Sequence, residues 1–459
     1  MVGLKSNRGL TNDDLWESIS RLPGSTSKAW DELFRVLELQ DQLLESEVVT
    51  ITADKIKALT RREPRLMTKF DTRESRPSRL ENVTILPLSN GEYALLKGDG
   101  YCDVPKATQV KVWNKPRLQP RLVTLPWNTG PASESQALDM AAAAGILDDF
   151  FGETNASLTI RGRLRSPQFD FRFRCETREI ALQVNGVQIE VDSGFEGERI
   201  HLVEAKLGNR TNFHVRQLYF PIRMWSALVS DKPVSAAFLT WSNRCVSIRS
   251  FHFDPLDLYQ SIEPVDRVDY LLDEPDQIPT LTELIESTPR CVAPAGIPFP
   301  QADDVRRVID MVDAIGAGVS TRSSIANRYD FHGRQADYYA NAAAYLGLLE
   351  RNAGAFELSR IGQQFWRAPL NRRYEIFLRQ MIARPVFRPI AQQFETSGTF
   401  PSREEVSEIV SAATSLTGAT SMRRARTALS WLRWAHETIQ SQEGLSHTKR
   451  EVTGQYRLF

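Results

Sequence analysis

Two kinds of hydrophobic periodicity divide the 459-residue chain. Before about residue 255, several short stretches alternate apolar and polar side chains, which is the period of a half-buried strand. The clearest case is 169–175, where Phe169, Phe171 and Phe173 alternate with charged side chains. After residue 298 the apolar side chains recur every three or four positions, which predicts amphipathic helices. The pattern therefore predicts an α+β multidomain protein.

The order of elements in the middle of the chain is helix, three strands, helix, strand. We expect these elements at 135–151 (helix), 169–175, 188–192 and 201–206 (strands), 212–229 (helix), then 235–240 and 245–253 (strands). Pro221 should kink the second helix or mark an early turn in it. Upstream, Asn90-Gly91 lies between two apolar runs and predicts a hairpin within an N-terminal α/β domain.

Changes in composition predict five segments. These are an N-terminal recognition or accessory domain (1–130), a domain of mixed helices and strands (131–255), an acidic, proline-rich linker (256–297), a helical domain (298–370) and a second helical domain (371–459). The formal net charge is zero, yet acids dominate 254–286 and seven arginines oppose Glu375 alone over 360–388. Such segregation either creates a positive face on a neutral protein or simply decorates solvated helices.

Several function classes are disfavoured by the sequence. No run of about 18 apolar residues predicts a membrane span. The first 14 residues lack the apolar core of a secretory signal, and the four cysteines are scattered without metal-binding spacing. We therefore expect a cytoplasmic protein with reduced thiols and no membrane partner.

The chemistry of the chain is concentrated between residues 188 and 208. Asp192 ends one predicted strand, and Glu204 and Lys206 lie two positions apart in the next, so these two share a face. If the strands pair as a hairpin, two carboxylates and one ammonium meet at one sheet edge. Metal-assisted phosphodiester hydrolysis requires such a set. The alternative is that Glu204 and Lys206 form an ion pair on an exposed strand.

Asp192 followed by Glu204-Ala205-Lys206 resembles the signature of the PD-(D/E)XK nuclease superfamily, with Val191 in place of the usual proline. The resemblance covers about residues 133–253. It implies that Asp192 and Glu204 bind Mg²⁺ together with the carbonyl of Ala205. It also implies that Lys206 orients or helps to deprotonate a water molecule and stabilises the transition state.

Three further residues are assigned weaker roles by the same resemblance. Gln217, on the following helix, would contact DNA or the water shell of the metal. Glu190, which shares a face with Asp192, would assist it, and Glu134, from the first helix, would be an outer ligand, although surface ion pairing is the favoured interpretation of both.

Three helices and a small hairpin over 298–370 resemble a winged helix-turn-helix domain, with 333–345 as its recognition helix. The residues expected to reach the major groove from this helix are Arg334, Gln335, Tyr338 and Asn341. A helix beginning near Thr420 would present Arg423, Arg424 and Arg426, in a second helical unit that also resembles a winged helix. The alternative for both is an ordinary bundle helix with solvated arginines.

Lys69, Arg73 and Arg76 form a basic stretch before the hairpin. They are candidates for contacts to DNA phosphates, and a solvated surface is the alternative.

Taken together, the chain resembles a type II restriction endonuclease. The resemblance implies double-stranded DNA as substrate, Mg²⁺ as cofactor and a cognate DNA methyltransferase as genetic partner. Cutting both strands requires a homodimer or sequential nicking by a monomer. Two alternatives stay open: a DNA-binding regulator with an inactive nuclease-like scaffold, and a structure-specific repair nuclease.

Overall fold

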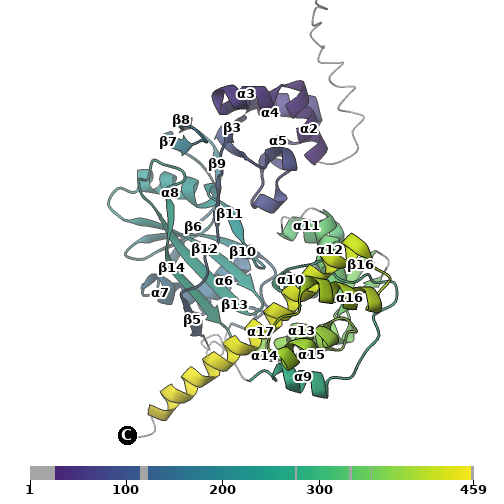
Figure 1. Cartoon of the computed structure of the whole chain (residues 1–459). Coiled ribbons are helices and arrows are strands. Elements are labelled where there is room, and N and C mark those ends of the chain that lie inside the picture. The colour runs from purple at the N-terminus through teal and green to yellow at the C-terminus, as the bar shows by residue number, and fades with distance from the viewer. Residues whose placement is uncertain (1–25, 114–121, 274–276, 330–332, 353, 456–459) are drawn as a thin grey trace, which may run out of the picture.

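The computed structural model describes residues 26–113, 122–273, 277–329, 333–352 and 354–455. Figure 1 shows an N-terminal module (purple), a central sheet domain (teal) and a C-terminal helical domain (green to yellow). Buried apolar side chains form one cluster in the N-terminal module, one on each face of the central sheet and one in the helical domain. The beginning of the predicted N-terminal domain, residues 1–25, lies outside the described residues.

The N-terminal module packs helices against a three-stranded sheet of order β1-β3-β2. Its elements are α2 (Thr26–Val36), α3 (Leu39–Ser46), β1 (Val48–Thr52), α4 (Ala53–Thr60), α5 (Pro64–Thr68), the 3₁₀ turns η1 (Arg73–Ser75) and η2 (Ser78–Leu80), β2 (Val83–Ser89) and β3 (Glu92–Lys97). The Asn90-Gly91 turn joins β2 and β3 as predicted, and Gly91 has a φ of +116°, which an L side chain rarely adopts.

The central domain is built on a seven-stranded mixed sheet of order β5-β14-β13-β12-β10-β9-β6. Its strands are β5 (Gln109–Val112), β6 (Ser157–Arg165), β9 (Gln188–Glu196), β10 (Ile200–Leu207), β12 (Val234–Ser242), β13 (Cys245–Phe253) and β14 (Ile262–Leu271). β9 pairs antiparallel with β10, and β10 pairs parallel with β12 after a crossover through α8 (Arg216–Leu228). The sheet thus takes three strands, β6, β9 and β10, before α8 and the strand β12 after it, but β6 is not the first strand that the sequence predicted.

Helices cover both faces of this sheet. α6 (Glu134–Ala143) and α7 (Ile146–Phe151) pack on one face, while α8 and the hairpin β7 (Phe169–Arg174)–β8 (Glu179–Val184) pack on the other. A further two-stranded ladder joins β4 (Tyr101–Asp103) to β11 (Asn212–His214). Pro221 is accommodated inside α8.

One predicted strand occupies a different place. Residues 169–174 form a strand, but β7 pairs only with β8, and Phe169 and Phe171 pack edge-on against Phe220 of α8. The outer strand of the main sheet is instead β6, which the pattern analysis missed. Its alternating apolar side chains are interrupted by Gly162, and of them only Ile160 is buried.

The prediction of an acidic linker over 256–297 is wrong for much of its length. Residues 262–271 form β14, whose Val268 and Tyr270 are buried in the sheet core while its acidic side chains alternate outward. α9 (Leu281–Ser287) packs into the helical domain. The predicted boundary at residue 130 also moves, because β5 pairs with β14.

The C-terminal part begins with the three helices and hairpin predicted from the sequence. Its elements are α10 (Val305–Gly316), α11 (Arg322–Tyr329), α12 (Gly333–Tyr345), β15 (Leu349–Asn352), β16 (Ala355–Leu358), α13 (Arg360–Arg367), α14 (Leu370–Ile382), α15 (Phe387–Ser397), α16 (Arg403–Ala413) and α17 (Gly418–Gln455). A single buried cluster spans residues 278–439, so the two predicted helical domains share one core. In the described residues, no helix has both the length and the apolarity to cross a membrane.

Candidate active site

The centre of the site is the point where β9 and β10 separate. Their ladder runs from Ile200 paired with Glu196 to Val203 paired with Ser193. At the next position, Asp192 Oδ2 accepts a hydrogen bond of 3.0 Å from the backbone N–H of Ala205. The carboxylate of Asp192 is thereby fixed beside β10, as the hairpin hypothesis required.

Glu204 and Lys206 lie side by side on the face of β10 that α8 covers. Lys206 Nζ donates to Glu204 Oε1 at 2.7 Å, and Gln217 Nε2 on α8 donates to the same oxygen at 2.5 Å. Val203 and Ala205 point to the opposite face, into the core formed with α6. The alternation of β10 thus separates the polar cluster from the hydrophobic core, and Glu204 and Lys206 are buried rather than an exposed surface pair.

Burial dominates the electrostatics of this cluster. It raises the pKa of the Glu204 carboxyl to about 8, with Asp192 adding to the effect and the Lys206 ammonium opposing it. Burial lowers the pKa of Lys206, but the carboxylates of Glu204, Glu134 and Asp192 outweigh it and raise that pKa well above its usual value. Lys206 therefore keeps its proton at neutral pH, which favours orienting and charge-stabilising roles over that of a base.

These side chains line a cavity of about 330 Å³ between the N-terminal module and the central sheet. The central domain contributes Glu134, Gln188, Glu190, Asp192, Glu204, Lys206, Arg216 and Gln217 to its polar lining, and the N-terminal module contributes Arg65, Thr68, Lys69, Asp71, Ser89 and Asn90. Both the carboxylates of Asp and Glu and the cationic groups of Lys and Arg therefore line the cavity.

The donor set suits a hard divalent cation. Asp192 and Glu204 offer carboxylate oxygens, and Gln217 Oε1 is buried without a hydrogen-bond partner. A cation here would offset the charge that burial disfavours on Glu204. Two protein carboxylates suffice for Mg²⁺, which retains several waters. Within the described chain, no group of three or more His, Cys, Asp or Glu side chains is arranged for metal binding.

The two weaker acidic candidates have different surroundings. Glu190 is bridged by Arg65 at 3.2 Å and Arg163 at 3.3 Å, which makes it the surface ion pair that was favoured for it. Glu134, in the first turn of α6, reaches Lys206 Nζ at 3.5 Å, and its side chain is 37% exposed, so it forms an ion pair at the edge of the cluster.

The three basic residues before the hairpin also lie in different surroundings. Lys69 lines the cavity, whereas Arg73 forms ion pairs with Asp99 and Asp103, and Arg76 lies 4.6 Å from the centre of the Tyr101 ring. Only Lys69 of these three is therefore placed to meet a substrate in the cavity.

The residues predicted to contact DNA from α12 are partly accessible. Tyr338 is exposed, and Gln335 and Asn341 are half-buried. The side chain of Arg334 lies outside the described part of the structure.

The arginines of α17 do not form one surface. Arg423 is exposed, and Arg426 is exposed but paired with Asp303 at 2.5 Å. Arg424 is buried, and its Nε and one terminal nitrogen have no hydrogen-bond partner. The expectation that all three point toward DNA is therefore wrong for Arg424.

The arginine run at 360–388 is largely structural. Arg373 is buried against Asp313 at 2.9 Å, Arg384 donates to the backbone oxygen of Val292, and Arg388 donates to that of Ile285. Three of the seven arginines therefore hold the helical domain together and are withdrawn from any positive face.

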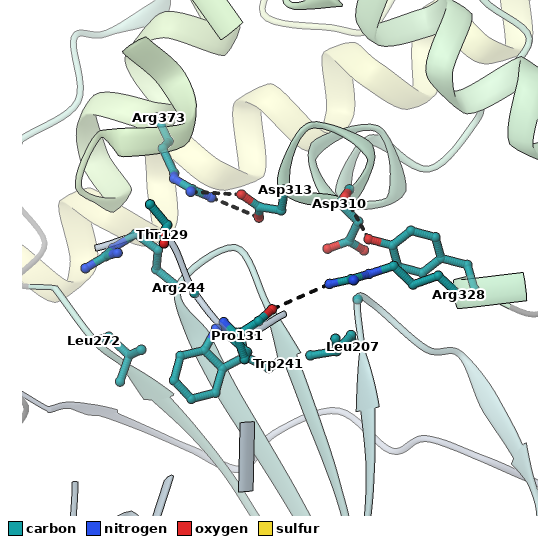
Figure 2. Close-up of a pocket in the computed structure, with 13 residues that line it drawn as sticks. Thr129, Pro131, Leu207, Trp241, Arg244, Leu272, Asp310, Asp313, Arg328 and Arg373 are labelled. Carbon is teal, nitrogen blue, oxygen red and sulfur yellow. Dashed lines mark hydrogen bonds and ion pairs between the residues drawn. The ribbon is translucent and has the colours of Figure 1, made fainter. Parts of the chain in front are cut away.

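The helical domain contacts the end of β10 directly. Asp310 of α10 accepts hydrogen bonds from the N–H of Asn209 and the hydroxyl of Ser242, each at 2.6 Å. Gly208 has a φ of +82°, and a side chain there would collide with the Tyr329 ring. Figure 2 shows Asp310 and Asp313 above the ends of the strands, and Tyr329 also lines the cavity of about 30 Å³ at this point. Burial raises the pKa of Asp310 to about 7.

Sequence reasoning missed several residues of the cavity, among them Asp71 and Arg216. Both line the cavity together with Lys69. Asp71 is 5% exposed, and Arg216 is the first residue of α8. Asp71 lies more than a hundred residues before the strand pair, and no motif spacing connects the two. The position of Arg216 beside Gln217 on the following helix was the available signal.

Three family models match the chain, and each describes a domain of unknown function. DUF6996 matches residues 27–95, DUF6997 matches 96–271 and DUF7226 matches 307–440. Neither a curated protein nor a solved structure matches it. The first match ends within β3 and the second ends with β14, so the cavity lies where the regions similar to DUF6996 and DUF6997 meet.

Proposed function

We propose that this protein is a Mg²⁺-dependent endonuclease that cuts double-stranded DNA at specific sites, as type II restriction enzymes do. The observation that carries the proposal is the meeting of Asp192, Glu204 and Lys206 at one point of a rigid sheet, in a cavity open to substrate. Strand order supports it, because a helix, three antiparallel strands, a crossover helix and a parallel strand make up the core expected of a PD-(D/E)XK nuclease.

Four polar side chains, those of Asp192, Glu204, Lys206 and Gln217, have a defined task in this proposal. Asp192 and Glu204 hold the cation, and the carbonyl of Ala205 is a third candidate ligand. Lys206, which keeps its proton, donates to a phosphate oxygen and stabilises the charge that develops during hydrolysis. Gln217 orients the Glu204 carboxylate through the bond to Oε1. When bound, Mg²⁺ supplies Lewis-acid neutralisation of the phosphate and lowers the pKa of water.

DNA is the favoured substrate because of the helical domain. α10, α11, α12 and the β15–β16 hairpin follow the order of a winged helix, and exposed Tyr338 on α12 is available to a groove. On this proposal the helical domain reads sequence and the central domain cuts. Contacts from Gln335, Asn341 and Arg423 belong to the same proposal.

Cleavage of unmethylated phage DNA tests the function. The protein is incubated with Mg²⁺, with Ca²⁺ or with EDTA, and the product ends are sequenced. Fixed double-strand ends in Mg²⁺ alone are expected. Preference for branched or damaged DNA would favour the repair nuclease instead. Tight, sequence-specific binding without cutting, unchanged in Lys206→Ala, would favour a regulator.

A further inference from the structure

The cavity contains a set of cations that the hydrolytic cluster does not use. Lys69 and Arg65 come from the N-terminal module, and Arg216 comes from the start of α8. All three line the same cavity as Asp192 and Glu204. A nuclease must hold the phosphates that flank the scissile bond as well as the scissile phosphate itself, and Lys and Arg are the side chains that do so.

Asp71 ties two of these cations together. Its Oδ2 lies 3.3 Å from Lys69 Nζ, and its Oδ1 lies 4.0 Å from a terminal nitrogen of Arg216. Asp71 is only 5% exposed, and its Oδ1 has no hydrogen-bond partner. The backbone carbonyl of Asp71 also accepts from the N–H of His214, which fixes the module against the central domain.

The charge state of Asp71 agrees with this arrangement. Burial raises its pKa, but Lys206, Lys69 and Arg216 outweigh burial and the pKa is lowered. The carboxylate is therefore ionised at neutral pH. It cannot neutralise both Lys69 and Arg216, so net positive charge remains on this side of the cavity.

We propose that Lys69 and Arg216, positioned by Asp71, form a subsite for a DNA phosphate that neighbours the scissile one. The proposal rests on the nuclease function proposed above and gives the N-terminal module a direct role in holding substrate. Arg216 lies at 4.0 Å from Asp71, beyond hydrogen-bond distance, so its guanidinium retains donors for a phosphate. Lys69 is 43% exposed and provides a point charge on a flexible stem.

A second ion pair, besides those of Asp71, joins the N-terminal module to the central domain at the cavity. Arg65, one turn before Lys69, bridges to Glu190 of β9 at 3.2 Å. This pair spans the boundary between the N-terminal module and the central domain and holds α5 over the cavity. The cations are thus presented from a fixed support rather than from a free loop.

The salt dependence of DNA binding tests the subsite. Binding of a fluorescent duplex is measured by anisotropy in EDTA, from 50 to 300 mM NaCl, for wild type, Lys69→Gln and Arg216→Gln. Each lost phosphate contact should reduce the slope of log K against log[salt] by about 0.9. In Mg²⁺, the same variants should raise KM for cleavage several-fold with kcat nearly unchanged.

Lys57→Gln is the matched control. Lys57 belongs to the same module, is 60% exposed and pairs with Glu63 at 2.9 Å, but it does not line the cavity. A slope unchanged by Lys57→Gln and reduced by Lys69→Gln supports the subsite. Equal slopes in wild type and Lys69→Gln, or an equal reduction in both lysine variants, would overturn it. Absence of cleavage by wild type would instead contradict the nuclease function. The salt dependence of DNA binding, measured in EDTA, would still test the phosphate subsite in that case.

Discussion

Two sets of residues predicted from sequence have opposite outcomes in the structure. On β9 and β10, Asp192, Glu204 and Lys206 line one cavity, where Asp192 accepts from the N–H of Ala205 and Lys206 donates to Glu204. On α17, the arginine triplet disperses, with Arg424 buried and Arg426 paired with Asp303. The difference shows which kinds of sequence pattern determine where a side chain points.

A strand has a period of two, so one buried neighbour fixes the direction of the next side chain. Val203 and Ala205 are apolar and enter the α6 core, which leaves Glu204 and Lys206 no choice of face. A helix distributes side chains around its whole circumference, and neighbouring helices decide which arc is covered. The sequence around residue 424 does not contain that information.

The largest expected effect is on catalysis at the strand pair. Lys206→Ala should reduce the single-turnover cleavage rate by about 10²–10³-fold, because a charge-stabilising donor is lost from a buried site. DNA affinity in EDTA should fall by no more than the loss of one phosphate contact causes. Lys232→Ala is the control, since Lys232 also pairs with a glutamate in this domain, at 2.6 Å. Equal cleavage rates in both variants would contradict the assignment of Lys206.

The next largest effect is expected at Asp310, where the helical domain contacts the central domain. Asp310 has a folded-state pKa near 7 against a usual value of 3.8, so its contribution to stability is complete below about pH 4 and is lost as the pH rises to 7. Asp310→Asn removes this titration. Relative to the variant, wild type should lose about 3 kcal/mol between pH 5 and pH 8.

Thermal unfolding of wild type and Asp310→Asn over that pH range measures the effect. The Tm of wild type should fall by a few °C relative to the Tm of Asp310→Asn as the pH rises. A Tm difference that is constant with pH would show that the Asp310 carboxyl titrates alike in the folded and unfolded chain.

A smaller effect is expected at Gln217. Gln217→Ala should reduce kcat by about tenfold, the equivalent of one hydrogen bond of about 1.4 kcal/mol, because Glu204 loses a donor that orients it. Gln217→Glu adds charge at the same place and should bind divalent cations at least as tightly as wild type. Cleavage rates titrated against Mg²⁺ separate the two effects, and a rate unaffected by Gln217→Ala would remove this residue from the site.

The smallest effects should come from the α17 arginines. Arg424→Met should leave DNA affinity unchanged and keep or raise Tm, because it replaces a buried charge that has unsatisfied nitrogens. Arg426→Gln breaks an exposed ion pair and should cost less than about 1 kcal/mol. A large loss of DNA affinity in Arg424→Met would restore that arginine as a DNA contact.

Much of the architecture could be predicted from the sequence because periodicity reflects local burial. The Asn90-Gly91 hairpin, strands β12 and β13, α10 and the helix–hairpin order after it are all found where the pattern places them. β6 and β14 were missed or misassigned for physical reasons. Gly162 breaks the alternation of β6, and the outward acids of β14 conceal its buried Val268 and Tyr270.

The site could be predicted only where its residues are local. Asp192, Glu204 and Lys206 lie within fifteen residues of one another, and one hairpin brings them together. Asp71 reaches the same cavity through the packing of the N-terminal module on the central domain. Such long-range packing depends on two complementary surfaces, and no spacing in the sequence encodes it.

Anomalous diffraction from crystals soaked in Mn²⁺, a hard divalent cation that can replace Mg²⁺ at oxygen ligands, tests the central claim most directly. We expect a peak bound by the carboxylates of Asp192 and Glu204 in wild type, and none in an Asp192→Asn, Glu204→Gln variant with the same fold. A wild-type crystal with no peak between these two carboxylates would contradict the assignment of a metal-dependent nuclease.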